Sequence, residues 1–577
     1  MLNRLVVALF VIGTLSAGAL TTLYVSPQGN DTNPGTRQRP FASVFRARDA
    51  IRKLKDADGL PGGGVVVEIA GGRYDVSETF ELTADDSGAA GKPVVYRCDP
   101  EARAWLVAGQ DIPVSALEPL TDPDIRARIP RGARPHVRCL DLEEAGVRFY
   151  TRLPNRFNCW AFTRRYPEEL GYKPEYGYEP GRWTPVEVFC DGRELTPARW
   201  PNRDHVRIDE VVDNGEGFCR DNVRGGTFTQ PSLKEKLKLW ASAEELILNG
   251  YFFRDYFGYS VRVGGIDLDA STITLSHGLL DKKHKPHQRF YVHHLPEELD
   301  VPGEWYLKRA TGLLCVWPPE GARTLTFPVL TDTMVRLKGA SHVTIRGLGL
   351  EGGRHHALEV TGGESNRIVA CDIRNVGRDG VLVKNGRDHR VLGCDIHHTG
   401  HAGVRLEGGD RKTLMPSGHV AENNHIHHTS RLVRNYSAPL YLGGVGNRAS
   451  RNLIHDIPHI AVCFWGNEHV MEFNEIFSVL YETNEAGIFY TGRDWTARGN
   501  IIRYNFMHHV TGVPDWGVNF VHLDDSASGT EIHGNVCYKL EKGVSICGGH
   551  ENKVHDNLFV ECLNTVTLTT RGIDMFE

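Results

Sequence analysis

The sequence predicts an all-β protein folded as a right-handed parallel β-helix solenoid, with an inserted mostly-β module and an N-terminal capping helix. Three observations support this fold: a motif that returns at intervals of about 22 residues or more, short strands rich in Val and Ile, and 62 glycines among 577 residues. Glycine in excess without low-complexity sequence indicates many tight turns, which a solenoid needs. The length is sufficient for one long core and an insertion.

The repeated motif consists of Cys or Asn, one further residue and a large apolar residue. Successive copies are 23, 30, 28, 22, 31, 30 and 22 residues apart, so a short base coil is lengthened in four coils. Asn amides at one position per coil can pass hydrogen bonds from coil to coil, and we therefore assign this column a structural role. The motif begins at Cys371, Cys394, Asn424, Asn452, Asn474, Asn505, Asn535 and Asn557.

Each coil also contains a second apolar strand that ends in a turn. If the coils are aligned, these strands lie side by side in one long parallel sheet. The strands are expected at residues 380–383, 403–406, 440–443, 461–464, 487–490 and 517–520.

The N-terminal part of the chain is expected to direct export and to cap the solenoid. Residues 1–19 have the basic start, apolar run and small residues around Ala17 and Ala19 of a secretory signal peptide, and the run is shorter than the ~20 residues of a spanning anchor. Residues 20–119 contain a capping helix from Ser43 to Ala57 and the first coils. We therefore expect a periplasmic or extracellular protein without membrane attachment after signal cleavage.

Residues 120–330 interrupt the repeat, and residues 331–577 form the main β-helix. The interruption is rich in aromatic residues, including Trp200, Trp240 and Trp305. We interpret it as an inserted module, and a separate carbohydrate-binding domain is the alternative.

Charge and cysteine content argue against several partners and constraints. The formal net charge is −6, from 66 basic and 72 acidic residues mixed along the chain, so no surface for nucleic acid is expected. The 12 scattered cysteines differ from the dense spacing of disulfide-stapled domains. We expect a monomer without a cofactor.

The candidate chemistry lies at strand ends, because side chains fill the interior of a β-helix. Two long coils end their second strand in acidic residues, namely Asp494 and the pair Asp524 and Asp525. Neighbouring strands are about 4.8 Å apart, so these carboxylates can reach the separations of glycosidases, ~5 Å for retention and more for inversion. Crowded like charges raise the pKa of one acid, with Arg493 as a possible counter-charge.

A further carboxylate, Glu485, stands at the other end of the same strand, in a column with Asp379. Glu485 is the second carboxylate if the site lies at this entry edge of the sheet instead. A purely structural role is the alternative for the acidic pair, because acids at strand ends often accept hydrogen bonds from turn amides. The catalytic candidates are Glu485, Asp494, Asp524 and Asp525.

An outward stripe is the candidate substrate-binding surface. If Val404, Val462 and Ile488 point inward, alternation turns aromatic residues outward, where sugar rings can stack on them. Contact with the inserted module is the alternative. The substrate-binding candidates are Arg405, Tyr441, Trp465, Phe489, Arg493, Trp495, His401 and His459.

Histidine pairs recur after the Asn column, at residues 397–398, 427–428 and 508–509. The simplest interpretation is that they are turn residues of the repeat. A metal site needs ligands that converge from different coils, and we predict none.

Four segments together are similar to a known family: residues 24–31, Ala-Arg-Trp-Pro-Asn at 198–202, Gly-Arg-Asp-Trp at 492–495 and Leu-Asp-Asp at 523–525. The combination resembles glycoside hydrolase family 141 and its close β-helix relatives, over nearly the whole mature chain. The resemblance implies an inserted β domain and hydrolysis of plant or algal polysaccharide, with fucosidase or xylanase activity. Relatives tend to have Asp at the position of Glu485 and to continue past Arg571, so we expect the last coils or cap to be missing.

The predicted function is a secreted glycoside hydrolase that cleaves a plant or algal polysaccharide with paired carboxylates. Two alternatives stay open. A polysaccharide lyase or epimerase on the same fold needs a Lys, Arg, His or Tyr base and often Ca²⁺. A non-catalytic carbohydrate-binding protein needs only the aromatic stripe.

Overall fold

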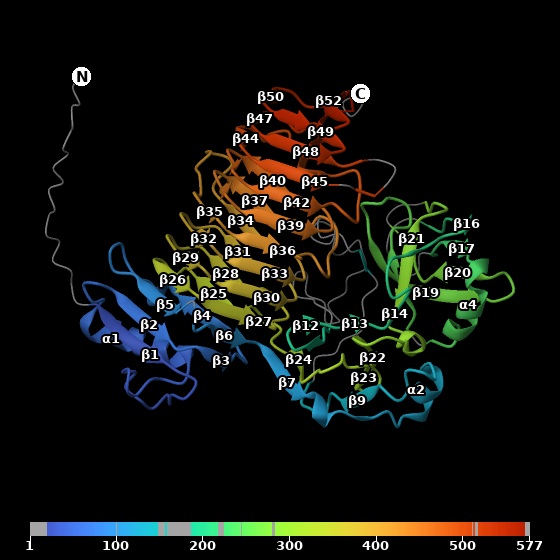
Figure 1. Cartoon of the computed structure of the whole chain (residues 1–577). Helices are drawn as coiled ribbons and strands as arrows, with labels where there is room; N and C mark the ends of the chain where they lie inside the picture. The colour runs from blue at the N-terminus through green and yellow to red at the C-terminus, as the bar shows by residue number, and fades with distance from the viewer. Residues whose placement is uncertain are drawn as a thin grey trace, which may run out of the picture.

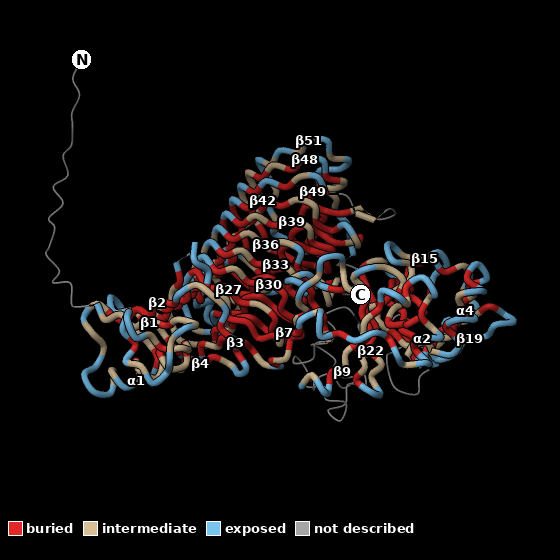
Figure 2. The backbone as a smooth tube through the Cα atoms, turned by 60° about the horizontal axis from the view of Figure 1, so that its bottom comes forward, coloured by how far each residue is buried: buried red, intermediate tan, exposed pale blue. Residues whose placement is uncertain are grey.

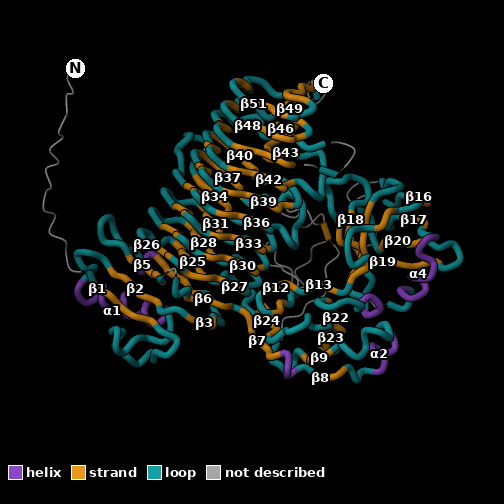
Figure 3. Tube along the Cα trace, in the orientation of Figure 1, coloured by secondary structure: helices purple, strands orange, loops and turns teal. Residues whose placement is uncertain are grey.

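The computed structural model describes residues 20–99, 101–147, 156–157, 186–216, 224–243, 245–279, 283–510, 512–513 and 517–571. The predicted signal peptide lies outside these residues. The chain is mostly β: three long parallel sheets form a β-helix, and antiparallel sheets lie beside it (Figures 1 and 3). The predicted fold class is therefore confirmed. Within the described ranges, no helix has the length and apolar character of a membrane span.

The solenoid is built from sheets 1, 2 and 3, to which each main coil adds one strand in turn. Sheet 1 contains β1 (Thr21–Val25), β2 (Val65–Ile69), β5 (Val94–Cys98), β26 (Val343–Arg346), β29 (Arg367–Val369), β32 (Arg390–Leu392), β35 (Val420–Glu422), β38 (Arg448–Ser450), β41 (Val470–Glu472), β44 (Asn500–Arg503), β47 (Thr530–His533) and β50 (Lys553–His555). Sheet 2 contains β3 (Gly72–Asp75), β6 (Ala104–Val107), β27 (Leu348–Glu351), β30 (Asp372–Val376), β33 (Asp395–Thr399), β36 (His425–His427), β39 (Leu453–Ile457), β42 (Glu475–Val479), β45 (Phe506–Val510), β48 (Val536–Leu540) and β51 (Leu558–Val560). Sheet 3 contains β4 (Phe80–Thr83), β25 (Val335–Lys338), β28 (Leu358–Thr361), β31 (Val381–Lys384), β34 (Val404–Gly408), β37 (Leu440–Val445), β40 (Val462–Asn467), β43 (Gly487–Gly492), β46 (Asn519–Asp524), β49 (Lys542–Cys547) and β52 (Asn564–Thr569).

The inserted sheets are antiparallel apart from one short parallel pair. The largest contains β14 (Arg199–Trp200), β21 (Arg289–His293), β18 (Ile247–Gly250), β19 (Tyr259–Asp267), β20 (Thr272–Leu275), β17 (Thr227–Thr229) and β16 (Glu210–Asp213), with β10 (Arg156–Phe157) on β19 and β15 (Val206–Arg207) on β21. A second contains β12 (Arg193–Glu194), β11 (Phe189–Cys190), β24 (Thr324–Pro328) and β7 (Gly109–Pro113). A third contains β13 (Thr196–Pro197), β22 (Glu304–Lys308), β23 (Leu313–Val316), β9 (Arg138–Asp141) and β8 (Glu118–Pro119).

The predicted N-terminal helix is present as α1 (Val44–Asp58). The Ser43 hydroxyl caps it by accepting a hydrogen bond from the Arg46 amide at 3.2 Å. The helix buries Val44, Ala47 and Ile51 and contacts β1, β2 and β4 at the start of the solenoid. The other described helices are α2 (Pro123–Arg128), α4 (Lys234–Trp240) and the 3₁₀ turns η1 (Ala84–Asp86), η2 (Val114–Ala116), η4 (Pro231–Leu233) and η5 (Pro296–Glu298).

The solenoid core is a stack of apolar side chains from successive coils. Figure 2 shows that buried positions recur from coil to coil along the solenoid. Ile396, Ile426 and Ile454 are partners in register and are fully buried. The described cysteines are free and all but Cys562 are buried, so they pack as small apolar residues.

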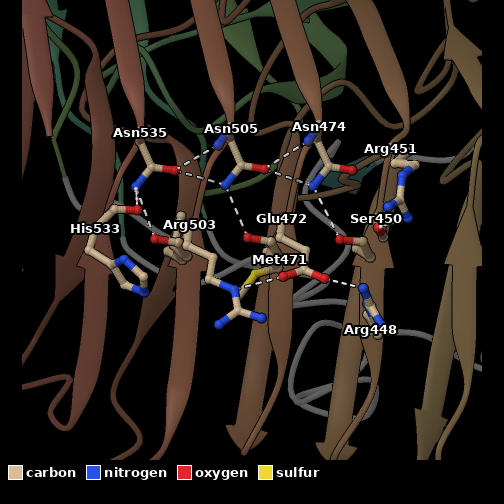
Figure 4. A network of polar contacts seen from close by, with 12 residues as sticks. Arg448, Ser450, Arg451, Met471, Glu472, Asn474, Arg503, Asn505, His533 and Asn535 are labelled. Carbon is tan, nitrogen blue, oxygen red and sulfur yellow. Dashed lines mark hydrogen bonds and ion pairs between the residues drawn. The ribbon is translucent and has the colours of Figure 1, made fainter. Parts of the chain in front are cut away.

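The Asn column forms a continuous amide ladder (Figure 4). Asn505 Oδ1 accepts hydrogen bonds from the Asn474 amide at 3.0 Å and from Asn474 Nδ2 at 2.9 Å. Asn505 Nδ2 donates to Asn535 Oδ1 at 2.9 Å and to the Met471 carbonyl at 3.0 Å. The predicted structural role of this column is therefore confirmed.

Candidate active site

The outer face of sheet 3 carries the predicted row of outward side chains, except that Tyr490 replaces Phe489. Cys463 lies in register between Tyr441 and Tyr490, and Tyr490 lies beside His522. These side chains alternate with core residues, as a parallel sheet requires. Arg405, Tyr441 and Trp465 therefore lie on this outer face, as predicted from the sequence.

The predicted outward orientation of Phe489 is wrong. Phe489, rather than Ile488, pairs with Val462 of β40, so the alternation is displaced by one residue. A slip of one residue exchanges the two faces of a strand. Phe489 is consequently fully buried in the core, and Tyr490 takes the outward position.

Asp524 ends β46 at the centre of a polar cluster. The Tyr490 hydroxyl donates to Asp524 Oδ2 at 3.0 Å, and the Asp525 amide donates to Asp524 Oδ1 at 3.0 Å. His522 Nε2 and Arg571 Nη1 each lie 3.7 Å from Asp524 Oδ1. Burial raises the pKa of Tyr490, with Tyr436 and Asp524 adding to it, so the phenol remains a proton donor to the carboxylate.

Asp525 is almost inaccessible and is held by two arginines. Its side chain is 1% exposed; Arg493 Nε donates to Oδ2 at 2.5 Å, and Arg571 Nε lies 3.0 Å from Oδ1. A buried carboxylate needs such partners to offset its desolvation. Asp525 therefore fixes Arg493 and Arg571 beside Asp524.

Glu485 approaches the same cluster from the turn that precedes β43. Burial raises the pKa of Glu485, and Asp524 acts in the same direction, whereas Arg254, Arg571 and a hydrogen bond from Tyr256 oppose the shift. Arg254 and Tyr256 belong to the inserted module and are hydrogen-bonded to each other. Glu485 precedes β43, whereas Asp524 ends the neighbouring β46. Arg571, which lies 3.7 Å from Asp524 Oδ1, also lowers the pKa of Glu485, so the two carboxyls border the same group of charges.

Asp494 has different partners. Arg411 Nη1 lies 2.9 Å from Asp494 Oδ2, and Arg411 Nη2 donates to Oδ1 at 3.0 Å. The Thr496 hydroxyl also donates to Oδ1 at 3.0 Å. These contacts join two loops that follow β34 and β43. The neighbouring Trp495 is 48% exposed and is accessible to a ligand.

The remaining predicted binding residues are largely enclosed. The Arg405 guanidinium lies 4.2 Å from the centre of the Tyr441 ring and pairs with Glu407. Burial lowers the pKa of His401 well below its usual range and that of His459 to about 3, so both imidazoles are neutral. Trp465 is partly exposed, and its Nε1 donates to Cys463 Sγ at 3.1 Å.

Several cluster residues were not predicted from the sequence. Tyr490, His522 and Cys547 follow from the correct register of β43, β46 and β49, but Arg254, Tyr256 and Arg571 have no local signal. His522 Nε2, an Asp524 oxygen and Cys547 Sγ lie within 4.8 Å of one another. Such a mixed donor set suits a transition metal rather than Ca²⁺.

Comparison with known proteins supports the fold. The family described as "Right handed beta helix region" matches residues 331–438. A solved structure named "Glycoside hydrolase" aligns with 96% of this chain and 100% of its own, at 15% identity and a TM-score of 0.67. Lower TM-scores of 0.42 and 0.37 are found for XylC with xylose and for a GH136 lacto-N-biosidase from Eubacterium ramulus, both at 10% identity. The alignments cover 94% and 95% of this chain and 86% and 68% of theirs.

No curated protein matches the sequence. The chain is therefore a right-handed β-helix protein, and a solved structure named as a glycoside hydrolase shares its fold.

Proposed function

We propose that this chain is a glycoside hydrolase acting on a plant or algal polysaccharide, related to family 141. Glu485 is the general acid, and Asp524 is the second carboxylate. The observation that supports this proposal is the polar cluster around Asp524, which accepts hydrogen bonds from Tyr490 and the Asp525 amide, together with the burial that raises the pKa of Glu485. Glycosidic cleavage requires one carboxyl with a raised pKa and a second, hydrogen-bonded carboxylate, and Glu485 and Asp524 have these properties.

The other residues of the cluster orient this pair. Tyr490 fixes Asp524 through its hydroxyl, and Asp525 fixes the two arginines. Asp494 holds the loop that carries Arg411, so we assign it a positioning role. Trp465 and Trp495 offer aromatic surface on which sugar rings can stack. We also propose, from the apolar N-terminal run, that the protein is exported. We further propose that it acts as a monomer.

A calcium-dependent lyase is the main competing function. Ca²⁺ takes six to eight oxygen ligands, whereas the metal-capable group here contributes one imidazole, one carboxylate and one thiol. Arg571, which lies 3.7 Å from Asp524, and Arg493 are both already paired with Asp525. The chemistry of these side chains therefore favours hydrolysis over uronate elimination.

The test is reducing-sugar release from plant and algal polysaccharides and from nitrophenyl glycosides. Asp524→Asn and Glu485→Gln are expected to lower kcat/KM by roughly 10²- to 10⁴-fold, the range for loss of a general acid or base. Asp494→Asn is the matched control and is expected to stay within about tenfold of wild type, because its contacts lie in the loops. Circular dichroism verifies folding of each variant.

Either of two results contradicts the proposal. Full activity in both Asp524→Asn and Glu485→Gln excludes the assigned carboxylates. An unsaturated product that absorbs in the ultraviolet, without hydrolysis, identifies a lyase instead.

A further inference from the structure

The outer face of sheet 2 carries a cluster of histidines that the proposed hydrolysis does not use. Strands β33, β36 and β39 lie side by side in the solenoid (Figure 1). Their register aligns Asp395 with His425, and His397 with His427 and His455. The His397 and His455 rings stack on either side of the His427 ring, at 4.9 Å and 5.1 Å between ring centres.

Three donor atoms in this cluster converge from two coils. His425 Nδ1 lies 3.2 Å from Asp395 Oδ1, and His427 Nε2 lies 3.3 Å from the same oxygen. Metal bonds of 2.0–2.1 Å at tetrahedral angles put two donors about 3.3 Å apart, so both separations fit one Zn²⁺-sized ion. The sequence prediction of no metal site assumed that ligands do not converge across coils, and here they do.

The hydrogen bonds around the cluster determine which imidazole nitrogens carry a proton. His455 Nδ1 lies 2.7 Å from Asp456 Oδ2 and donates its proton there, so His455 Nε2 accepts a proton from His425 Nε2 at 2.8 Å. His425 Nδ1 is then a bare lone pair. These tautomers are assigned from the hydrogen-bond partners.

The second imidazole reaches the same state through its neighbour. His427 Nδ1 lies 2.7 Å from His428 Nδ1, and His428 Nε2 is 3.9 Å from Asp456 Oδ2. If His428 keeps its proton on the side of Asp456, His427 donates from Nδ1 and presents a bare Nε2 to Asp395. A ligand histidine oriented by its other ring nitrogen is the usual arrangement at metal sites.

Asp395 Oδ1 completes the site. Among the described residues, no hydrogen bond of acceptable geometry reaches this oxygen, although it is shielded from water. A carboxylate oxygen facing two lone pairs is repulsive unless a cation stands between them. The side chains remain 48% and 39% exposed at Asp395 and His425, so an ion can enter and keep a bound water.

We propose that Asp395, His425 and His427 bind one divalent transition-metal ion of the Zn²⁺ class, with water as the fourth ligand. Two imidazoles and one carboxylate disfavour Ca²⁺ and Mg²⁺, which take oxygen ligands. The ion links β33 to β36 on a sheet other than that of Glu485 and Asp524. Its role is to clamp two coils, independent of the proposed hydrolysis.

The test is zinc binding to the full chain, measured by competition with a chromophoric chelator and by metal analysis after dialysis. Cys547→Ser is used as the background, so that the group around Asp524 does not contribute. Asp395→Asn and His427→Ala are each expected to weaken binding by at least about tenfold. His508→Ala is the matched control, because it occupies the same column but has Phe506 at the position of His425.

The expected result is one zinc per chain, lost in Asp395→Asn and His427→Ala and retained in His508→Ala. Zinc is also expected to raise the thermal unfolding midpoint of the Cys547→Ser background but not of the His427→Ala variant. Equal binding in all variants, or equal losses in His427→Ala and His508→Ala, would show diffuse surface binding and overturn the proposal. Hydrolase activity is not part of this readout, so the two proposals fail independently.

Discussion

Sheets 2 and 3 are built from the same coils, yet they differ around the two candidate sites, because the inserted module contacts the coils beside sheet 3 and leaves the histidines of sheet 2 partly exposed. Beside sheet 3, Tyr436 in the loop before β37 lies 6.0 Å from Phe257 of the inserted module and 5.7 Å from Tyr490, between ring centres. On sheet 2, His425 and His428 remain 39% and 48% exposed. Burial shifts carboxyl pKa values, whereas partial exposure leaves ligand atoms accessible. The same backbone thus supports a candidate catalytic cluster on one face and a candidate metal site on the other.

A substitution that weakens the contact between the inserted module and the coils beside sheet 3 should have the greatest effect on stability. Glu482 Oε1 accepts a hydrogen bond from Tyr251 of the inserted module at 2.8 Å, and Arg434 Nε donates to Oε2 at 2.9 Å. Burial alone raises the pKa of Glu482, but Arg434 and Tyr251 outweigh it and lower the pKa to about 2. We expect Glu482→Gln to lose roughly 3 kcal/mol of unfolding free energy at pH 7, because it removes the counter-charge of Arg434, whose side chain is only 28% exposed.

The direction of the Glu482 pKa shift determines how this loss of stability depends on pH. A carboxyl whose pKa is lowered in the folded state stabilises the fold above its ordinary pKa, and that stabilisation disappears as the pH falls through the folded value. The difference between wild type and Glu482→Gln should therefore shrink between about pH 5 and pH 2 in denaturant titrations. Glu551→Gln, in an exposed pair with Arg498, is the control; an equal loss there would contradict the comparison.

A smaller effect is expected from Tyr256→Phe, which tests whether the inserted module influences the pKa of the proposed general acid. The Tyr256 hydrogen bond lowers the pKa of Glu485, so its removal should raise that pKa further. A general acid acts while protonated, so the falling limb of the kcat/KM profile should move to higher pH, by up to about one unit. Tyr504→Phe, on an exposed tyrosine, should leave the limb in place. Movement to lower pH would rule out Glu485 as the acid.

The smallest effect on stability is expected on the partly exposed outer face of sheet 2. Phe477 stacks on His508 at 4.9 Å between ring centres, with the planes 13° apart. A double-mutant cycle of Phe477→Ala and His508→Ala should give a coupling of roughly 0.5–1.5 kcal/mol in thermal unfolding. A coupling well above that range would indicate that this face is covered in solution, and the contrast with sheet 3 would fail.

The solenoid was predictable because its signals are local and repeated. The spacing of the Asn column alone fixes the coils, and Asn474, Asn505 and Asn535 form the expected ladder. The error at Phe489 has a physical cause. Ile488, Phe489 and Tyr490 are all apolar or aromatic, so the sequence pattern does not reveal a shift of one residue in the strand register. Register is then decided by pairing with β40, which the sequence does not state.

The candidate site was only partly predictable for a related reason. Asp524 and Glu485 could be proposed because each flanks one end of a strand in the repeat, where side chains can leave the packed core. Arg254, Tyr256 and Arg571 reach the same cluster from distant parts of the chain, and such convergence has no signature in short windows of sequence. The histidine cluster shows the same limit: His425 and His427 belong to one motif, but Asp395 belongs to the coil before it.

The amide ladder keeps neighbouring coils aligned even where their loops differ in length. Asn452 reaches Asn474 across 22 residues and Asn474 reaches Asn505 across 31, yet both amide contacts measure 2.9 Å. Residues added elsewhere in a coil therefore leave its neighbours in step. Evolution, or an engineer grafting loops, can lengthen the loops beside the candidate active site while the stacked strands keep their positions, so the loops and the architecture can change at different rates.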